Sequence, residues 1–217
     1  MDSTLHALSA LAAAADAREA RIAWREASRT LGPELEEYRP LLELLCSRAA
    51  ELSRLRRLAG TDELTGLPNR RAFRESLDRE VARLARGGHP FAVVMLDLDG
   101  LKQLNDEHGH AAGDRALQLA ADALSRALRA SDLPSRLGGD EMAVLLPETG
   151  REGARIVAER MRHAIEGCTV EGRALRVSLG IAVAERMGTG ADELVALADM
   201  RLYRDKRSRK SKAPRAA

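Results

Sequence analysis

In Arg136-Leu-Gly-Gly-Asp-Glu-Met-Ala-Val-Leu-Leu146, two glycines stand directly before two adjacent carboxylates, and an apolar run follows. This order predicts a tight hairpin, because glycine tolerates the positive φ that short hairpin turns require. A phosphate group could then lie over Gly138 and Gly139, with Asp140 beside it to hold a metal ion. Gly-Gly-Asp is also common in simple turns, so this stretch alone leaves an ordinary hairpin with a charged turn as the alternative.

The segments around this hairpin alternate between strand and helix patterns. Apolar runs predict strands at 91–96, 133–137, 142–146 and 174–184. Thr61-Asp62 supplies a helix N-cap, and helices are predicted at 69–86, at 114–129, from a Thr149-Gly-Arg-Glu152 capping box to 165, and at 191–206. The order β-α-β-β-α-β is typical of an α+β fold with a central, mostly antiparallel sheet of the ferredoxin-like or polymerase-palm type.

Residues 1–59 are rich in Ala, Leu, Arg and Glu and contain no strand-like run, so we expect an all-helical N-terminal region. In its last helix the apolar residues follow a 3-4 spacing that Arg48 interrupts: Tyr38, Leu41, Leu45, Leu52, Leu55 and Ala59. This spacing fits a short coiled-coil stalk for a dimer, and it also fits an amphipathic helix packed on its own domain. We therefore predict a helical regulatory or dimerisation region at 1–59, the α+β domain at 60–210, and a basic tail at 211–217.

The composition limits the class of protein. The chain has 217 residues, 45% of them apolar and 2% aromatic, so its core is expected to consist of aliphatic side chains. A net charge of +2 is too small to indicate a nucleic-acid binder, although residues 201–217 hold eight Lys or Arg and one acid. Cys46 and Cys168 have no partner pattern, which favours reduced thiols in the cytoplasm. The longest uncharged run near the start, residues 3–15, is shorter than the ~18 residues of a membrane span.

The strand predicted at 91–96 ends in Asp97-Leu-Asp99. Alternation would place both carboxylates on one side and Leu98 on the other. If this strand lies beside the 133–146 hairpin, Asp97 and Asp140 meet at one edge of the sheet. Two neighbouring carboxylates repel each other unless a cation lies between them, and Mg²⁺ prefers oxygen ligands that substrate phosphates can complete. An acidic sheet edge facing water is the alternative for Asp-x-Asp on its own.

Further motifs extend this pattern along residues 61–210. They are Asp62-Glu-Leu-Thr-Gly-Leu-Pro-Asn-Arg-Arg71, Asp97-Leu-Asp-Gly-Leu-Lys102, Asn105-Asp106, Gly109-His110, Gly113-Asp114, Arg129-Ala-Ser-Asp132, Arg136-Leu-Gly-Gly-Asp-Glu141, Ser178-Leu-Gly180 and Ala198-Asp199 with Tyr203 and Lys206. In order and spacing they resemble the GGDEF-domain family of diguanylate cyclases. The resemblance implies condensation of two GTP into cyclic di-GMP, with release of two pyrophosphates.

The resemblance assigns metal and catalytic roles. Asp97 and Asp140 match the metal carboxylates, and the carbonyl of Leu98 matches a backbone ligand. Two Mg²⁺ or Mn²⁺ ions per active site would activate the attacking hydroxyl and neutralise the leaving pyrophosphate. Asp140 also occupies the position of a proposed proton acceptor, although it is expected to act first as a metal ligand. Glu141 would contribute to metal binding or would position the turn.

The resemblance also assigns the nucleotide contacts. Lys102, Lys206 and Lys210 match cationic positions near the triphosphate, while a solvated basic tail is the alternative for Lys206 and Lys210. Asn105 and Asp114 match the positions that recognise guanine. A carboxylate can accept both N1–H and the exocyclic amine of guanine, and adenine would leave it unpaired. The alternative for Asp114 is a helix N-cap after Gly113.

Arg129-Ala-Ser-Asp132 matches the RxxD site at which the family binds its product as an inhibitor, and Arg160 falls where a secondary arginine of that site can lie. A helix-end arginine followed by a turn aspartate is the ordinary explanation of such a motif. We expect a product-inhibited enzyme that works as a homodimer on GTP, without nucleic acid or a membrane span. A catalytically silent receptor for cyclic di-GMP or GTP, and a palm-type enzyme that makes another nucleotide, are the alternatives.

Two single positions and one three-residue segment depart from the family's pattern. Met142 and Leu101 each stand in place of a phenylalanine, and both remain apolar, so we expect activity to survive with altered packing near the turn. The family's terminal Gly-Arg-Asn is here Arg209-Lys-Ser211. Lysine cannot hold a phosphate bidentately as arginine can, so the contact of this tail with phosphate differs from the family's.

Overall fold

The computed structural model describes residues 60–186 and 188–212. The predicted helices and coiled-coil spacing of residues 1–59 lie outside the described residues, as does most of the predicted basic tail. Within the described part, no helix is long and apolar enough to cross a bilayer.

The centre of the fold is a four-stranded antiparallel sheet. Its strands are β1 (Phe91–Leu98), β2 (Leu133–Gly138), β3 (Glu141–Leu146) and β6 (Val177–Ala184), in the order β2-β3-β1-β6. Strand β1 pairs with β3 on one side and with β6 on the other. The α+β fold and the antiparallel sheet expected from the sequence are therefore confirmed.

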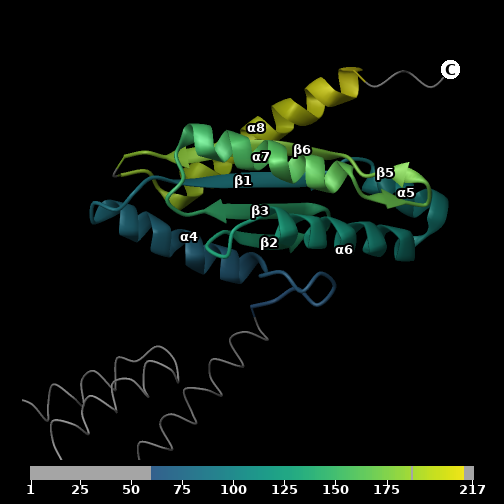
Figure 1. Ribbon diagram of the computed structural model, residues 1–217, viewed down its shortest axis with the longest axis horizontal. Coiled ribbons are helices and arrows are strands. Elements are labelled where there is room, and N and C mark those ends of the chain that lie inside the picture. The colour runs from purple at the N-terminus through teal and green to yellow at the C-terminus, as the bar shows by residue number, and fades with distance from the viewer. Residues whose placement is uncertain (1–59, 187, 213–217) are drawn as a thin grey trace, which may run out of the picture. The chain divides into compact units, whose positions relative to one another are not determined.

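Helices cover both faces of this sheet (Figure 1). On one face, α6 (His110–Ala127) and α7 (Arg151–Glu166) pack against alternate residues of β1, among them Val94 and Leu96. On the other face, α4 (Arg70–Ala85) and α8 (Ala191–Lys212) pack against Phe91, Val93 and Met95. Burial on both faces explains why β1 is a continuous apolar run instead of an alternating one.

Helix α8 lies on β6 with almost no space between the two backbones. A Cβ atom added to Gly180 of β6 would be 2.0 Å from the carbonyl oxygen of Ala198 and 2.3 Å from the nitrogen of Leu202. Only glycine fits at this crossing, which gives a packing reason for the Ser178-Leu-Gly180 motif. The last turns of α8, which contain Lys206 and Arg209, are thereby fixed relative to the end of the sheet.

Two predicted helix caps are wrong, although both helices begin within one residue of the predicted starts. Helix α4 is capped by Asn69, whose side-chain oxygen accepts from the N–H groups of Arg71 and Ala72. Asp62 instead closes the preceding turn by accepting from Thr65. The predicted capping box before α7 does not form, because the Thr149 hydroxyl donates to the carbonyl of Pro147 and Gly150 is the N-cap.

Three short elements, one helix and two strands, were not predicted. Helix α5 (Leu101–His108) precedes α6, and α6 begins at His110, so Asp114 lies inside a helix and is not the N-cap considered above. The predicted strand at 174–184 begins only at Val177. The residues before it form a small hairpin, in which β4 (Thr169–Val170) pairs with β5 (Arg173–Ala174). Each of these elements is too short to show a clear apolar period.

Candidate active site

The end of β1 lies beside the turn between β2 and β3. Asp97 pairs in register with Glu141, and the backbone N–H of Leu98 donates to the carbonyl of Asp140 at 3.4 Å. Gly138 and Gly139 in the turn have φ values of +143° and +54°, which side chains with a Cβ rarely adopt. The glycine pair therefore brings Asp140 to the same edge of the sheet as Asp97.

A surplus of negative charge gathers at this edge. Burial raises the pKa of Asp97, and the negative charges of Asp140 and Asp99 raise it further, against a lowering by Lys206. The Lys206 ammonium donates to Asp97 Oδ1 at 2.6 Å. Burial lowers the pKa of Lys206, but Asp97, Asp140 and Asp99 outweigh that effect and raise it above its ordinary value. The Lys206 ammonium thus contacts Asp97 directly, and Asp140 and Asp99 act on its pKa only through their charge.

The donor set at this edge suits a hard divalent cation. Asp97 and Asp140 offer carboxylate oxygens. The carbonyl of Leu98, the residue after Asp97, offers a backbone oxygen. Within residues 60–186 and 188–212, no three His, Cys, Asp or Glu side chains converge closely enough to hold a metal by themselves. The set fits a cation only where phosphate oxygens complete the coordination, as Mg²⁺ in nucleotide sites requires.

Glu141 and Asp99 face other partners. The Glu141 carboxylate lies 3.5 Å from the Arg70 guanidinium, which places it beside helix α4 and favours a role in positioning the turn. Asp99 follows the last residue of β1, and its two oxygens accept from the Ser178 hydroxyl at 2.8 and 2.9 Å. Asp99 also pairs with Arg209 of α8, so it lies on the α8 side of the sheet together with Asp97, as alternation predicts.

Sequence reasoning missed the residues that hold the glycine turn. The Arg136 guanidinium donates to the Gly139 carbonyl from two nitrogens, at 3.2 and 3.0 Å, and to both oxygens of Asp62, at 3.0 and 3.1 Å. Burial raises the pKa of Asp62, but hydrogen bonds from Thr65 and Arg136 lower it to below its ordinary value. Both Arg136 and Asp62 stand in the motifs quoted above, but their pairing across 74 positions has no local signal.

The residues matched to guanine recognition lie where α5 meets α6. A Cβ atom on Gly113 would be 1.8 Å from Asn105 Oδ1, so this glycine lets the asparagine pack directly against α6. Asn105 Oδ1 is buried and has no hydrogen-bond partner within the described residues, whereas Asp114, the residue after Gly113, is exposed. A buried amide oxygen without a partner costs free energy, which a ligand with N–H groups can recover.

Of the three lysines expected near a triphosphate, only Lys206 is seen at the sheet edge beside Asp97. Lys206 lies at the sheet edge, and Lys102 is exposed on α5. Lys210 belongs to α8, but its side chain lies outside the described part. Arg209, which sequence reasoning noted only as a departure, forms ion pairs with Asp99 at 3.6 Å and with Glu166.

A family model described as "Diguanylate cyclase, GGDEF domain" matches residues 59–212. The chain belongs to the GGDEF-domain family. Among curated relatives, it is 43% identical over 156 residues to the diguanylate cyclase DgcP of Pseudomonas aeruginosa, covering 70% of this chain and 23% of DgcP. It is 38% identical over 157 residues to the response regulator PleD of Caulobacter vibrioides, covering 70% of this chain and 35% of PleD. The chain thus spans about a quarter to a third of these relatives.

Solved GGDEF structures are also similar to this chain. The diguanylate cyclase SiaD of Pseudomonas aeruginosa, solved with its activator SiaC, matches with a TM-score of 0.71 and 34% identity, over 88% of this chain and 75% of that one. The GGDEF domain of DgcB from Caulobacter crescentus, solved with c-di-GMP, matches with a TM-score of 0.66 and 30% identity, over 69% of this chain and 89% of that one.

Two departures from the GGDEF pattern prove to be packing positions. Met142 is 1% exposed in the core between the sheet and α6, and Leu101 packs partly buried against the same core. Neither side chain forms a polar contact that a phenylalanine would remove. The structure therefore gives no reason to connect these two replacements with a loss of chemistry.

The RxxD residues of this GGDEF domain form a closed turn directly after α6. Asp132 Oδ2 accepts from the backbone N–H of Arg129 at 2.9 Å, and the Asp132 N–H donates to the Arg129 carbonyl at 3.0 Å. The Arg129 side chain is exposed, as is Arg160 on α7, the helix that packs beside α6. The turn thus presents a guanidinium to solvent on the helical face of α6 and α7.

Proposed function

We propose that this domain is an active diguanylate cyclase, which condenses two GTP into cyclic di-GMP and releases two pyrophosphates. The observation that most supports the proposal is the juxtaposition of Asp97 and Asp140 beside the Gly138-Gly139 turn. Phosphoryl transfer needs carboxylates that can hold cations next to backbone that a phosphate can approach closely. Both acids and both glycines are intact here.

In the proposed reaction, the 3′-oxygen of one GTP attacks the α-phosphorus of the other. The bond from that phosphorus to the bridging oxygen of the β-phosphate breaks, and pyrophosphate leaves with that oxygen. The proton of the 3′-hydroxyl passes to a carboxylate, for which Asp140 is the candidate, and then to solvent. A second transfer with the nucleotides exchanged closes the ring. Two Mg²⁺ or Mn²⁺ ions held by Asp97, Asp140 and the Leu98 carbonyl would acidify the hydroxyl and neutralise the pyrophosphate.

The side chains of this domain position the nucleotide. Asp114 would accept from N1–H and the exocyclic amine of guanine, and the unpartnered Asn105 oxygen lies at the adjoining helix contact. Lys206, with Lys102 and Lys210, would neutralise the triphosphate. Because Lys206 is paired with Asp97 by a single hydrogen bond, a phosphate at this edge can accept from the same ammonium.

The working form is proposed to be a symmetric homodimer. Each domain offers one set of metal carboxylates and one guanine site, whereas the reaction joins two nucleotides. Two domains must therefore face each other around a twofold axis, so that each nucleotide supplies a hydroxyl to the other. Specific activity is expected to fall on dilution as dimers dissociate, which initial rates at several protein concentrations would measure.

The direct test is incubation of the full chain with GTP and Mg²⁺ or Mn²⁺, followed by chromatography for cyclic di-GMP. We expect product with either metal, no product with a chelator, and little product from ATP. A folded, dimeric preparation that makes no cyclic di-GMP with either metal would refute the proposal. A preference for ATP would contradict the role of Asp114.

The second candidate is a catalytically silent receptor for cyclic di-GMP or GTP. It is favoured by one relative, the cyclic di-GMP phosphodiesterase NbdA of Pseudomonas aeruginosa, which is 35% identical over 155 residues, 70% of this chain and 20% of NbdA. Similarity to a GGDEF domain therefore also occurs in a protein named for another reaction. Binding of cyclic di-GMP without turnover of GTP, lost in Arg129→Ala, would support the receptor.

A further inference from the structure

The outer edge of strand β6 is covered by side chains from two helices. Within the described residues, β6 pairs only with β1, so the backbone groups on its other side have no strand partner. Arg162 of α7 donates to the Val177 carbonyl at 3.0 Å, and the N–H of Leu179 donates to Asp205 Oδ2 of α8 at 2.9 Å. Val177 and Leu179 are alternate residues of this edge, so the two side chains take the place of a neighbouring strand.

Asp205 and Arg162 also bind each other. The Arg162 guanidinium donates to the same Oδ2 atom of Asp205 at 3.1 Å, and the exposed fractions of the two side chains are 15% and 26%. A carboxylate that accepts two hydrogen bonds with little access to water is costly to remove, because both donors then stay unpaired. Asp205 therefore attaches α8 to the sheet and to α7 at one point.

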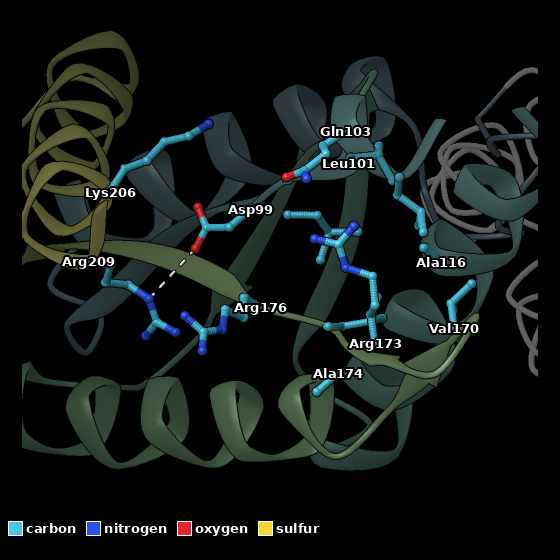
Figure 2. A pocket seen from close by; sticks show the side chains of 14 residues that line it. Asp99, Leu101, Gln103, Ala116, Val170, Arg173, Ala174, Arg176, Lys206 and Arg209 are labelled. Atoms are coloured by element: carbon cyan, nitrogen blue, oxygen red, sulfur yellow. Dashed lines mark ion pairs between the residues drawn. The ribbon is translucent and has the colours of Figure 1, made fainter. Parts of the chain in front are cut away.

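The next residue of α8 is Lys206, whose ammonium donates to Asp97 Oδ1 at 2.6 Å. Successive residues of a helix point about 100° apart, which lets Asp205 contact the outer edge of β6 while Lys206 contacts the end of β1. Figure 2 shows Lys206 extending from α8 along the cavity that Asp99 also lines. Because the two residues are consecutive, the attachment of Asp205 also fixes the direction of Lys206.

The place of this attachment along α8 gives it a second effect. The tight crossing at Gly180 involves Ala198 and Leu202, whereas Lys206 lies about one turn beyond Leu202. A helix held at a single crossing can still pivot about it, and a pivot displaces most the residues that lie beyond the crossing. Asp205 adds a second point of attachment directly beside Lys206, and this second point opposes the pivot.

We propose that Asp205 is a positioning residue, which holds the Lys206 ammonium where a triphosphate can reach it. Asp205 acts through its contacts with β6 and α7, and it does not itself touch the nucleotide. A displacement of about 1 Å would weaken the hydrogen bonds from Lys206 to phosphate oxygens, because such bonds depend steeply on distance and angle. This inference rests on the proposed function, because it takes the triphosphate as the ligand of Lys206.

The first test observes Lys206 in the full chain without nucleotide, by nitrogen NMR of the side-chain ammonium groups at one fixed pH. The chain has four lysines, Lys102, Lys206, Lys210 and Lys212, so substitution of Lys206 by arginine assigns its signal. In Asp205→Leu, which removes the acceptor, we expect this signal to move to the position of exposed lysines. In Asp205→Asn, whose amide oxygen still accepts from the Leu179 N–H, it should stay near that of wild type.

Arg162→Gln provides a second variant for the same measurement. It removes one of the two donors to Asp205 and should move the Lys206 signal part of the way, so the test remains decisive if Asp205→Leu does not fold. Circular dichroism establishes which variants are folded. A Lys206 signal that stays unchanged in the folded variants would overturn the proposal.

The second test measures affinity for 3′-deoxy-GTP with Mg²⁺ by titration calorimetry, because this analogue lacks the attacking hydroxyl and binds without reacting. Lys206→Met and Asp205→Leu are each expected to weaken binding by about tenfold. The double variant should bind no more weakly than Lys206→Met alone, because Asp205 acts only through Lys206. If the two losses multiply instead, Asp205 acts independently of Lys206 and the proposal is wrong.

The matched control is Glu193→Leu, which makes the same replacement at an exposed acid in the first turn of α8. It should leave the Lys206 signal and the affinity for the analogue as in wild type, and effects equal to those of Asp205→Leu would overturn the proposal. Cyclic di-GMP formation from GTP is measured separately on the wild type. Absence of that product counts against the proposed function alone, since the NMR signal and the affinities require no turnover.

Discussion

The Arg136 side chain holds the Gly138-Gly139 turn by contacts to two separate segments. Its guanidinium bridges the Gly139 carbonyl and the Asp62 carboxylate, so the start of the domain is tied to the turn that presents Asp140. Both partners of this ion pair are largely buried, with side-chain exposures of 13% and 23%. Such a pair is expected to stabilise the fold as well as the geometry of the site.

Asp62→Asn tests that pair. Because the folded pKa of Asp62 is lowered, its charge stabilises the fold above the ordinary value of 3.8, and this stability is lost as the pH falls through the folded pKa. We expect a loss of about 2 kcal/mol in the free energy of unfolding at neutral pH. Chemical denaturation from pH 7 to 3 should show the difference from wild type shrinking below 3.8.

A difference in stability that stays constant over this pH range would contradict the assignment to the Asp62 charge. The neighbouring substitution Glu63→Gln is a suitable control, because Glu63 is exposed. It should change the free energy of unfolding by less than about 0.5 kcal/mol.

Asp140→Ala tests the chemistry at the same edge. Removal of one proposed metal carboxylate is expected to lower turnover at least about a hundredfold. Helix and strand content should be retained, because the turn is held by Arg136 and the glycines. Circular dichroism and initial rates measure the two effects, with the exposed Asp122→Ala of α6 as the control. Wild-type rates in Asp140→Ala would remove Asp140 from the mechanism.

At the scale of elements, the sequence predicts those helices and strands whose buried side chains recur with a regular spacing. Strand β1 and the helices that cover the sheet follow from continuous or 3.6-residue apolar patterns. Helix α5 has only Leu101 and Leu104 to face the core, and the β4 and β5 strands have two residues each, so no pattern could indicate them. The missed α5 led directly to the wrong placement of Asp114 at a helix start.

The candidate site also contains some residues that the sequence could predict and others that it could not. Asp97, Asp140 and the glycine turn could be predicted, because strand ends and hairpins have local signals. The Arg136–Asp62 pair, the Ser178–Asp99 hydrogen bonds and the Arg209 ion pairs depend on tertiary contacts between distant segments. Single-sequence patterns do not encode which distant side chains meet, so these supports became visible only in the fold.

The crossing of α8 over β6 gives a prediction for an element. Gly180→Ala forces a methyl group into the backbone of α8, with contacts of 2.0 and 2.3 Å that no rotamer change can relieve. We expect a loss of about 3 kcal/mol or more in the free energy of unfolding, measured by chemical denaturation. Gly150→Ala is the control, since a Cβ there has no neighbour within 4 Å and its φ is −82°. Equal effects of the two substitutions would mean that the crossing tolerates a side chain.

At the scale of the whole molecule, the RxxD turn after α6 is the proposed site of product inhibition, and its Arg129 side chain is exposed. If it binds cyclic di-GMP, Arg129→Ala should raise the concentration of cyclic di-GMP that halves the initial rate by at least about tenfold, because a bidentate guanidinium contact is lost. Initial rates with added cyclic di-GMP measure this shift. Arg126→Ala, an exposed arginine at the end of α6, is the control. An unchanged inhibition curve in Arg129→Ala would show that the turn is not the inhibitory site.

The close contact of α8 with β6 at Gly180 also limits how far α8 can move relative to the sheet. The close packing of the two backbones at Gly180 opposes sliding or rolling of α8 on β6, so we expect the helix to stay fixed at this crossing. We therefore do not expect the C-terminal end of α8, which holds Lys206 and Arg209, to shift as a rigid unit toward a nucleotide. If the domain binds nucleotide as proposed, adjustment between its free and bound states would come from the long, rotatable side chains of Lys206 and Arg209. Structures with different nucleotides should superimpose along α8 and differ in these two side chains.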